Sequence, residues 1–136
     1  MCEVSFLKNT KKDNEALNRK NVILLKKFKE SKDDIEKKEI MNEIVVNNTR
    51  IARKIANNYY SKCNLKGTSI EIEDLEQEAF IGIVAAVNKF NHNVNTRFLT
   101  YSHWWIKQKI IRYIQNAKDT IEFQLIYYKK TAGYTS

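Results

Sequence analysis

The chain has 136 residues, a length that suits one domain with a hydrophobic core and is short for two. Its 24 lysines and arginines against 16 aspartates and glutamates give a formal net charge of +8, which favours a polyanionic partner, although basicity alone is weak evidence. No apolar run approaches the roughly 20 residues of a membrane span, two isolated cysteines cannot build a disulfide framework, and His92 and His103 lack a zinc-binding spacing to Cys63.

The composition predicts an all-α protein. Proline is absent, glycine occurs three times, and Lys, Glu, Ile and Asn are abundant. We expect a compact bundle of about four helices in the cytoplasm, without a metal, a cofactor or a membrane partner. We divide the chain into an N-terminal extension with a short helix (1–33), a helical domain (34–118) and a short C-terminal tail (119–136).

The first two predicted helices cover residues 14–28 and 34–60. Ser31 and Asp33 are candidate N-caps for the second of them. Apolar residues recur at helical spacing in this second helix: Ile40, Ile44, Ile51, Ile55 and Tyr59. Asn48 falls inside that apolar stripe, where a buried amide needs hydrogen-bond partners. It therefore either bridges to another helix, the more common solution, or lines a polar pocket.

The third predicted helix begins in an acidic segment. Five acids and no base lie between residues 70 and 78: Glu71, Glu73, Asp74, Glu76 and Glu78. Acids in a first helical turn favour the helix dipole, which is the simplest explanation, but five exceed what capping needs. Asp74 and Glu78 share one face of the helix, and Gln77 and Ile81 are adjacent to it. We interpret this face as a negative docking patch for a basic protein surface.

The same helix has an apolar side that contains a glycine. Its predicted buried stripe consists of Leu75, Ala79, Ile83, Ala86, Val87 and Phe90. Gly82 interrupts a favourable helical sequence at a cost of about 1 kcal/mol relative to alanine. We infer that another helix approaches closely at this residue.

The fourth predicted helix, from about Leu99 to Ala117 or Lys118, has two faces of different chemistry. One face is a core stripe: Phe98, Ser102, Ile106, Ile110, Tyr113 and Ala117. The other face carries three aromatic rings, an amide and a guanidinium: Tyr101, Trp104, Trp105, Gln108 and Arg112. Such a surface can stack on bases and rest on a phosphate backbone, unless both faces are buried in a larger core. No reliable helical pattern continues beyond residue 118.

The order of residues in the last two predicted helices resembles region 2 of bacterial sigma factors of the sigma-70 family. The resemblance rests on Asp74-Leu-x-Gln-Glu-x-x-Ile-Gly-x-x-x-Ala-Val-x-Lys-Phe and on Phe98-x-Thr-Tyr-x-x-Trp-Trp-Ile-x-Gln-x-Ile-x-Arg. Residues 48–59 resemble the helix that opens that region. The similarity covers about residues 35–118 and implies a helical fold like that of region 2.

The resemblance implies two binding surfaces. Asp74, Gln77 and Glu78 match the face that docks on the clamp helices of the largest subunit of core RNA polymerase. A second set matches contacts to promoter DNA, mainly the non-template strand of the −10 element: Asn48, Ile51, Phe90, Phe98, Thr100, Tyr101, Trp104, Trp105, Gln108 and Arg112.

Each DNA-contacting position has an implied role. The positions around a flipped adenine are matched by Phe90, Phe98, Thr100, Tyr101 and Trp104. Trp104 and Trp105 match a wedge at the upstream fork of the opened duplex. Gln108 matches a reader of the first base pair, and Arg112 matches a backbone contact. Asn48 and Ile51 match the pocket for the last flipped thymine, a role that would add a base to the partners of the buried amide. Two positions depart from the family pattern: Val94 replaces a frequent arginine, and Ile111 replaces a frequent threonine.

These implied roles describe a transcription initiation factor without catalytic residues, and not an enzyme. It would bind core RNA polymerase and recognise and melt the −10 element. The segments that read the −35 element have no counterpart in this sequence, so we expect a second protein to supply −35 contacts. The alternative is a regulator that occupies the clamp and competes with complete sigma factors without initiating. A purely structural bundle is the third hypothesis.

Overall fold

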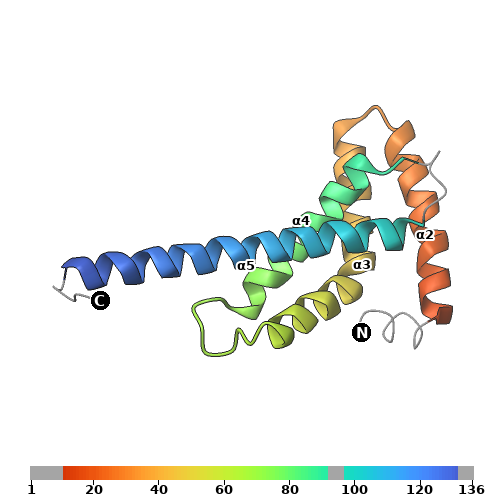
Figure 1. The fold of residues 1–136 in the computed structure, drawn as a ribbon. Coiled ribbons are helices and arrows are strands. Elements are labelled where there is room, and N and C mark those ends of the chain that lie inside the picture. The colour runs from red at the N-terminus through yellow and green to blue at the C-terminus, as the bar shows by residue number, and fades with distance from the viewer. Residues whose placement is uncertain (1–10, 92–96, 132–136) are drawn as a thin grey trace.

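Four α-helices form the part of the chain that the structure describes (Figure 1). This structure is a computed structural model that describes residues 11–91 and 97–131, with side chains for 14–91 and 97–118. The helices are α2 (Lys11–Glu30), α3 (Asp34–Lys62), α4 (Ile72–Lys89) and α5 (Phe98–Thr131), and no strand occurs within the described ranges. The all-α prediction is confirmed. No described helix combines the length and the apolar character needed to cross a membrane.

Side-chain contacts fix the short turn between α2 and α3. Asp33 is the N-cap of α3, and its Oδ1 accepts a hydrogen bond from the Ile35 N–H at 3.1 Å. Ser31 Oγ donates to Glu36 Oε2 at 3.1 Å. The Lys37 ammonium lies 5.1 Å from the centroid of the Phe28 ring. These contacts therefore link the C-terminal end of α2 to the N-terminal end of α3.

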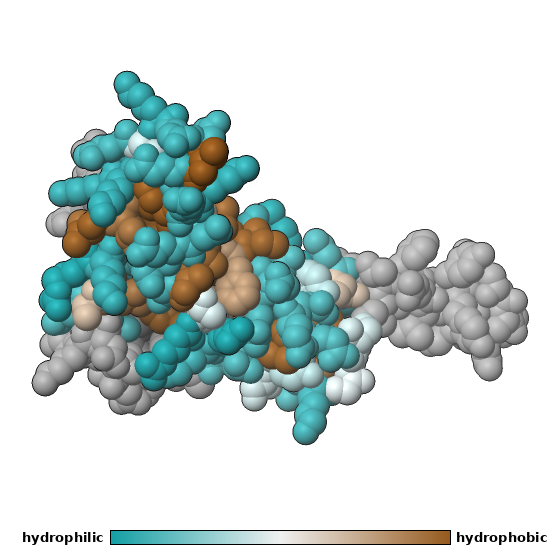
Figure 2. Space-filling model, turned by 180° about the vertical axis from the view of Figure 1, so that it is seen from behind, coloured by the Kyte–Doolittle hydropathy of each residue, from teal (hydrophilic) through white to brown (hydrophobic). Residues whose placement is uncertain are grey.

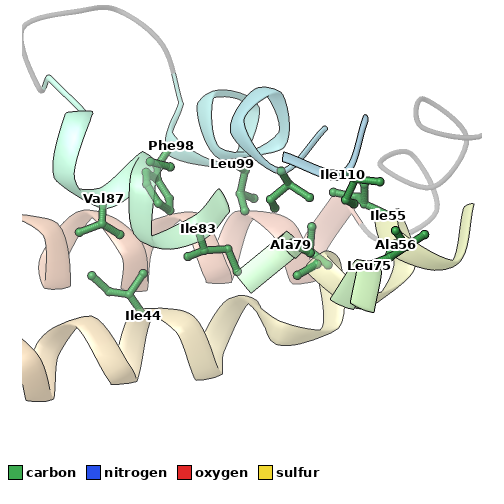
Figure 3. Packing of buried hydrophobic residues seen from close by; sticks show 14 of the residues in the cluster. Ile44, Ile55, Ala56, Leu75, Ala79, Ile83, Val87, Phe98, Leu99 and Ile110 are labelled. Atoms are coloured by element: carbon green, nitrogen blue, oxygen red, sulfur yellow. The ribbon is translucent and has the colours of Figure 1, made fainter. Parts of the chain in front are cut away.

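The core lies among α3, α4 and α5. Apolar side chains from these three helices point into one space in Figure 3, where the labelled residues are Ile44, Ile55, Ala56, Leu75, Ala79, Ile83, Val87, Phe98, Leu99 and Ile110. The connection between α3 and α4 contributes two more buried residues, Leu65 and Ile70. Among its described side chains, helix α2 adds two buried apolar residues, Leu24 and Leu25.

Helices α4 and α5 are in backbone contact at Gly82. A Cβ atom placed on Gly82 would lie 2.7 Å from the Ile106 Cα and 2.9 Å from the Ile106 N. The inference of a close helix approach at this glycine is therefore correct. Because no side chain separates the two helices here, their backbones set the distance between the two helix axes at the crossing.

Some apolar side chains remain exposed outside the core. Four of them lie on α2 and α3: Val22, Ile23, Ile35 and Val46. Figure 2 shows the molecule from behind. Apolar residues are scattered among hydrophilic ones on the part of this surface that lies opposite the projecting end of α5. Single exposed apolar residues are normal on soluble proteins.

Helix α5 is longer than predicted. It continues to Thr131, past the expected end at residue 117 or 118, and its C-terminal part projects away from the other helices (Figure 1). The expected end assumed that no helical pattern long enough to trust follows residue 118. Extending an existing helix costs little compared with nucleating one, and neither proline nor glycine interrupts residues 98–131. The backbone therefore remains helical to Thr131.

Candidate nucleic-acid interface

Five aromatic rings form a continuous row from the end of α4 along the first turns of α5. The centroids of Phe98 and Phe90 are 5.4 Å apart, and those of Phe90 and Tyr101 are also 5.4 Å apart. Tyr101 then lies 6.4 Å from Trp105, and Trp105 lies 5.1 Å from Trp104. All four pairs meet edge to face, an arrangement that stabilises aromatic pairs.

The row leads from the core to solvent. Phe98 is 3% exposed and Phe90 is also buried, whereas Trp104 is 52% exposed. Tyr101 and Trp105 are half-buried and pack against the core. The aromatic face predicted for this helix is therefore neither a fully open surface nor fully buried. Phe90 and Phe98, both predicted as base contacts, are buried and support the rings above them.

Lys89 holds the middle of the aromatic row. Its carbonyl accepts a hydrogen bond from the Tyr101 hydroxyl at 3.3 Å. Its ammonium lies 5.7 Å from the centroid of the Trp105 ring. Trp105 Nε1 is buried and has no acceptor among the described residues. The half-buried rings thus have fixed positions, while Trp104 remains free to meet a ligand.

The predicted polar contacts follow the aromatic row along α5. Thr100 and Arg112 are exposed, and Gln108 is half-buried. Trp104, Gln108 and Arg112 are four residues apart, so they lie on one side of the helix. The structure therefore brings together Tyr101, Trp104, Trp105, Gln108 and Arg112 as one side of α5.

The other predicted base site, Asn48 with Ile51, is closed. Asn48 is 2% exposed, and Ile51 is also buried. Asn48 Nδ2 donates to Asn21 Oδ1 at 2.9 Å and to the Ile44 carbonyl at 2.7 Å. Asn48 Oδ1 accepts from Asn21 Nδ2 at 3.2 Å. Of the two alternatives for this buried amide, the structure shows the bridge to another helix.

Asn21 was missed by the sequence analysis, although a signal exists. It lies four residues after Leu17 and three or four before Leu24 and Leu25, inside the apolar stripe of the first helix. An amide at such a position needs a buried partner, as Asn48 does. Two asparagines in two facing stripes are a pattern that could have predicted the pair.

The acidic segment serves partly as a helix start. Asp74 accepts a hydrogen bond from the Glu71 N–H at 3.1 Å in a capping box at the start of α4. Glu76 forms an ion pair with Arg53 of α3 at 3.5 Å. The simplest explanation of the acids, helix capping, therefore applies to part of the segment. Within the described residues, no three His, Cys, Asp or Glu side chains are grouped in a way that could hold a metal ion.

The remaining side of α4 is open to a partner. Gln77 is exposed and Glu78 is half-buried. Ile81, about one turn further along α4, is 49% exposed. Tyr113, assigned to the core stripe from the sequence, is half-buried at its edge, where its hydroxyl bonds to Asp74. Burial, the charge and hydrogen bond of Asp74, and the charge of Glu78 raise the pKa of Tyr113 above its ordinary value of 10.0.

Known proteins share this pattern of residues. The family model of sigma-70 region 2 matches residues 44–120. RNA polymerase sigma factor SigA of Mycoplasma genitalium is 33% identical over 91 residues, covering 67% of this chain and 17% of the relative. SigA of a Nostoc species is 32% identical over 88 residues, covering 65% and 21%. RpoD of Helicobacter pylori is 36% identical over 84 residues, covering 62% and 12%.

The matched region contains both candidate surfaces, the open side of α4 and the aromatic side of α5. The chain spans between 12% and 21% of the length of these three relatives. The family model covers more than half of this chain. The chain belongs to the sigma-70 region 2 family.

Proposed function

We propose that the chain is a promoter recognition domain that binds core RNA polymerase and opens the −10 element of promoter DNA. The observation that carries this proposal is the aromatic row that ends in the exposed Trp104, within the segment matched by the family model. The relatives, which are named as RNA polymerase sigma factors, support the same role. Binding and strand opening make and break no covalent bond, so the domain acts without catalytic residues.

Strand opening is the task of the aromatic side of α5. A base leaves the duplex stack at a cost of a few kcal/mol, and stacking on an aromatic ring returns about 1–3 kcal/mol per base. Trp104 can act as a wedge because its ring is exposed, while Tyr101 and Trp105 are held behind it. Gln108 and Arg112 follow on the same side, where the upstream duplex would lie.

Polymerase binding is the task of the open side of α4. Asp74, Gln77 and Glu78 would contact a basic surface, the clamp helices of the largest polymerase subunit. Ile81 adds an apolar contact next to these polar groups. Protein interfaces commonly combine an apolar core with a polar rim. The −35 element would be read by a second protein held on the same polymerase.

The experiment measures binding of single-stranded −10 oligonucleotides by a purified complex of this chain with core polymerase. We expect affinity to depend on the base sequence and to fall when single bases are removed. A complex that forms, excludes a complete sigma factor and binds every oligonucleotide equally would instead identify a competitor. Failure of the chain to bind core polymerase would contradict both roles.

A further inference from the structure

The apolar face of α5 continues beyond the body of the protein. Ile110 and Ile114 are buried, and the half-buried Ala117 packs against the core. At helical spacing the same face continues with three further apolar positions: Ile121, Leu125 and Tyr128. The part of α5 that carries these positions projects away from α2, α3 and α4 (Figure 1). The face that packs on the core in one half of the helix therefore has no described helix beside its other half.

Such a face favours packing against a partner helix. An apolar stripe contributes to stability only when it is removed from water. Helices in proteins owe most of their stability to the packing of such a face, and less to intrinsic propensity. Residues 118–131 form about 20 Å of helix, enough for several layers of side chains to meet a second helix of the same length.

The charged positions beside the stripe are arranged to fit a second copy of the same helix. Glu122 and Lys129 are two helical turns apart and lie on the same flank of the stripe. In an antiparallel pair of identical helices, each flank faces the same flank of the other copy, with the sequence running in the opposite direction. Glu122 of each copy would then be opposite Lys129 of the other, and Leu125 would be next to the two-fold axis.

The same charges distinguish between the two possible orientations. A parallel pair would bring each flank against the opposite flank of the other copy. That opposite flank carries no charge between residues 118 and 131, where its positions are Thr120, Gln124, Tyr127 and Thr131. The opposite charges of Glu122 and Lys129 are therefore matched only when the two helices run antiparallel.

We propose that the projecting part of α5 is a dimerisation element, which pairs antiparallel with the same part of a second copy of this chain. Ile121, Leu125 and Tyr128 of the two copies form the apolar seam. Because the interface is symmetric, the contact between Glu122 and Lys129 occurs twice. The bodies of the two copies lie at opposite ends of the paired helices. The open side of α4 and the aromatic side of α5 remain outside the seam in both.

The first test measures self-association of the full 136-residue chain by analytical ultracentrifugation. We expect a concentration-dependent equilibrium between monomer and dimer. Ile121→Asn places an amide in the seam and should weaken the dimer at least tenfold, since the lost apolar contact occurs in both copies. Ile126→Asn is the matched control, because it makes the same substitution about 140° around the helix from Ile121. It should leave the dimer unchanged.

A charge exchange tests the antiparallel orientation without altering the apolar seam. Glu122→Lys and Lys129→Glu each place like charges opposite one another, and each should weaken the dimer on the order of tenfold at low salt. An equimolar mixture of the two variants should associate as well as wild type, and so should the double variant, because opposite charges then face each other again. Circular dichroism checks that every variant remains helical.

Three outcomes would overturn the inference. The first is a wild-type chain that remains monomeric up to about 1 mM. The second is a dimer that survives Ile121→Asn unchanged, which would place the contact elsewhere on the molecule. The third is a mixture of the two charge variants that associates no better than either variant alone.

Discussion

Trp104 projects from a row of rings whose other end is fixed in the core. Phe98 and Phe90 are buried, and Tyr101 and Trp105 are held by contacts with Lys89. Removing any of these four side chains alters packing as well as any contact with DNA. Trp104 is the aromatic residue of this row whose loss should separate binding from stability.

We therefore predict that Trp104→Ala lowers the free energy of unfolding by only about 0.5–1.5 kcal/mol, through loss of the edge-to-face contact with Trp105. Duplex opening at the −10 element should fail, and a pre-opened bubble should partly restore it because the unpairing cost is already met. Phe98→Ala is the contrasting variant and should cost about 3–5 kcal/mol. Thermal melting and a permanganate footprint measure both effects. A strongly destabilised Trp104→Ala would place this ring in the core.

Tyr113 gives a prediction about pH. Because its pKa is raised by burial and by Asp74 and Glu78, the folded state favours the neutral hydroxyl. This contribution to stability is complete below pH 10.0, the ordinary pKa, and is lost as pH rises through the higher folded value. We expect the urea midpoint to fall less steeply above pH 10 in Tyr113→Phe than in wild type. Identical slopes in wild type, Tyr113→Phe and the control Tyr60→Phe would contradict the hydrogen bond to Asp74.

At the scale of elements, the position of α5 depends on its contact with α4 at Gly82. An added methyl group would meet the Ile106 backbone, which cannot rotate away as a side-chain end can. We predict that Gly82→Ala destabilises the protein by about 1–3 kcal/mol, as overpacking does, despite a gain of about 1 kcal/mol in helix propensity. Denaturant unfolding measures the change. Asn88→Ala, at an exposed position of α4, is the control and should be neutral or slightly stabilising.

The open side of α4 can be tested without disturbing the start of the helix. Asp74 caps α4, so its replacement would affect folding as well as binding. Glu78→Lys and Ile81→Asn avoid this problem, and we expect each to weaken association with core polymerase at least several-fold. Only the loss in Glu78→Lys should depend on salt, since Ile81 carries no charge. Glu43→Lys and Val46→Asn on α3 are the matched controls; equal binding by all four variants would exclude this side of α4.

The helices and the α4–α5 crossing could be predicted because each depends on local sequence. Asp33 is a strong N-cap, and Gly82 has no local reason to be in a helix. Two features were missed for different reasons. Ile121, Leu125 and Tyr128 continue the helical spacing of the preceding apolar residues and could have marked the extension of α5 to Thr131. The partner of Asn48, in contrast, lies 27 residues away in sequence. Which aromatic residues of a face are exposed depends on how far the neighbouring helix covers them, as Tyr101 and Trp104 show.

At the scale of the whole molecule, charge is unevenly distributed along the chain. Acids are concentrated at the start of α4, whereas residues 97–118 carry five bases and no acid: Arg97, Lys107, Lys109, Arg112 and Lys118. A protein of this kind can hold a basic protein surface with one helix and a polyanion with another. Increasing salt should weaken both contacts, with a steeper loss for the contact to DNA.

The second protein proposed to supply −35 contacts can be tested by transcription. We expect the chain to support little promoter-specific run-off transcription with core polymerase alone, and much more when a second protein supplies −35 contacts. Two modest interactions on one polymerase reinforce each other through effective concentration. The measurement is run-off transcription with and without candidate partner proteins. Efficient promoter-specific transcription by the chain and core polymerase alone would show that no such partner is needed.

The contact between Gly82 and Ile106 is a point about which the long helix α5 can pivot. Trp104 lies two residues from this contact, whereas Thr131 lies 25 residues beyond it, about 38 Å along a continuous helix. A tilt of the helix by about 10° at the crossing would move the far end by about 6–7 Å, while the helix axis at Trp104 would shift by about 0.5 Å. Small adjustments at the DNA-contacting end would thus be magnified at the other end of the molecule.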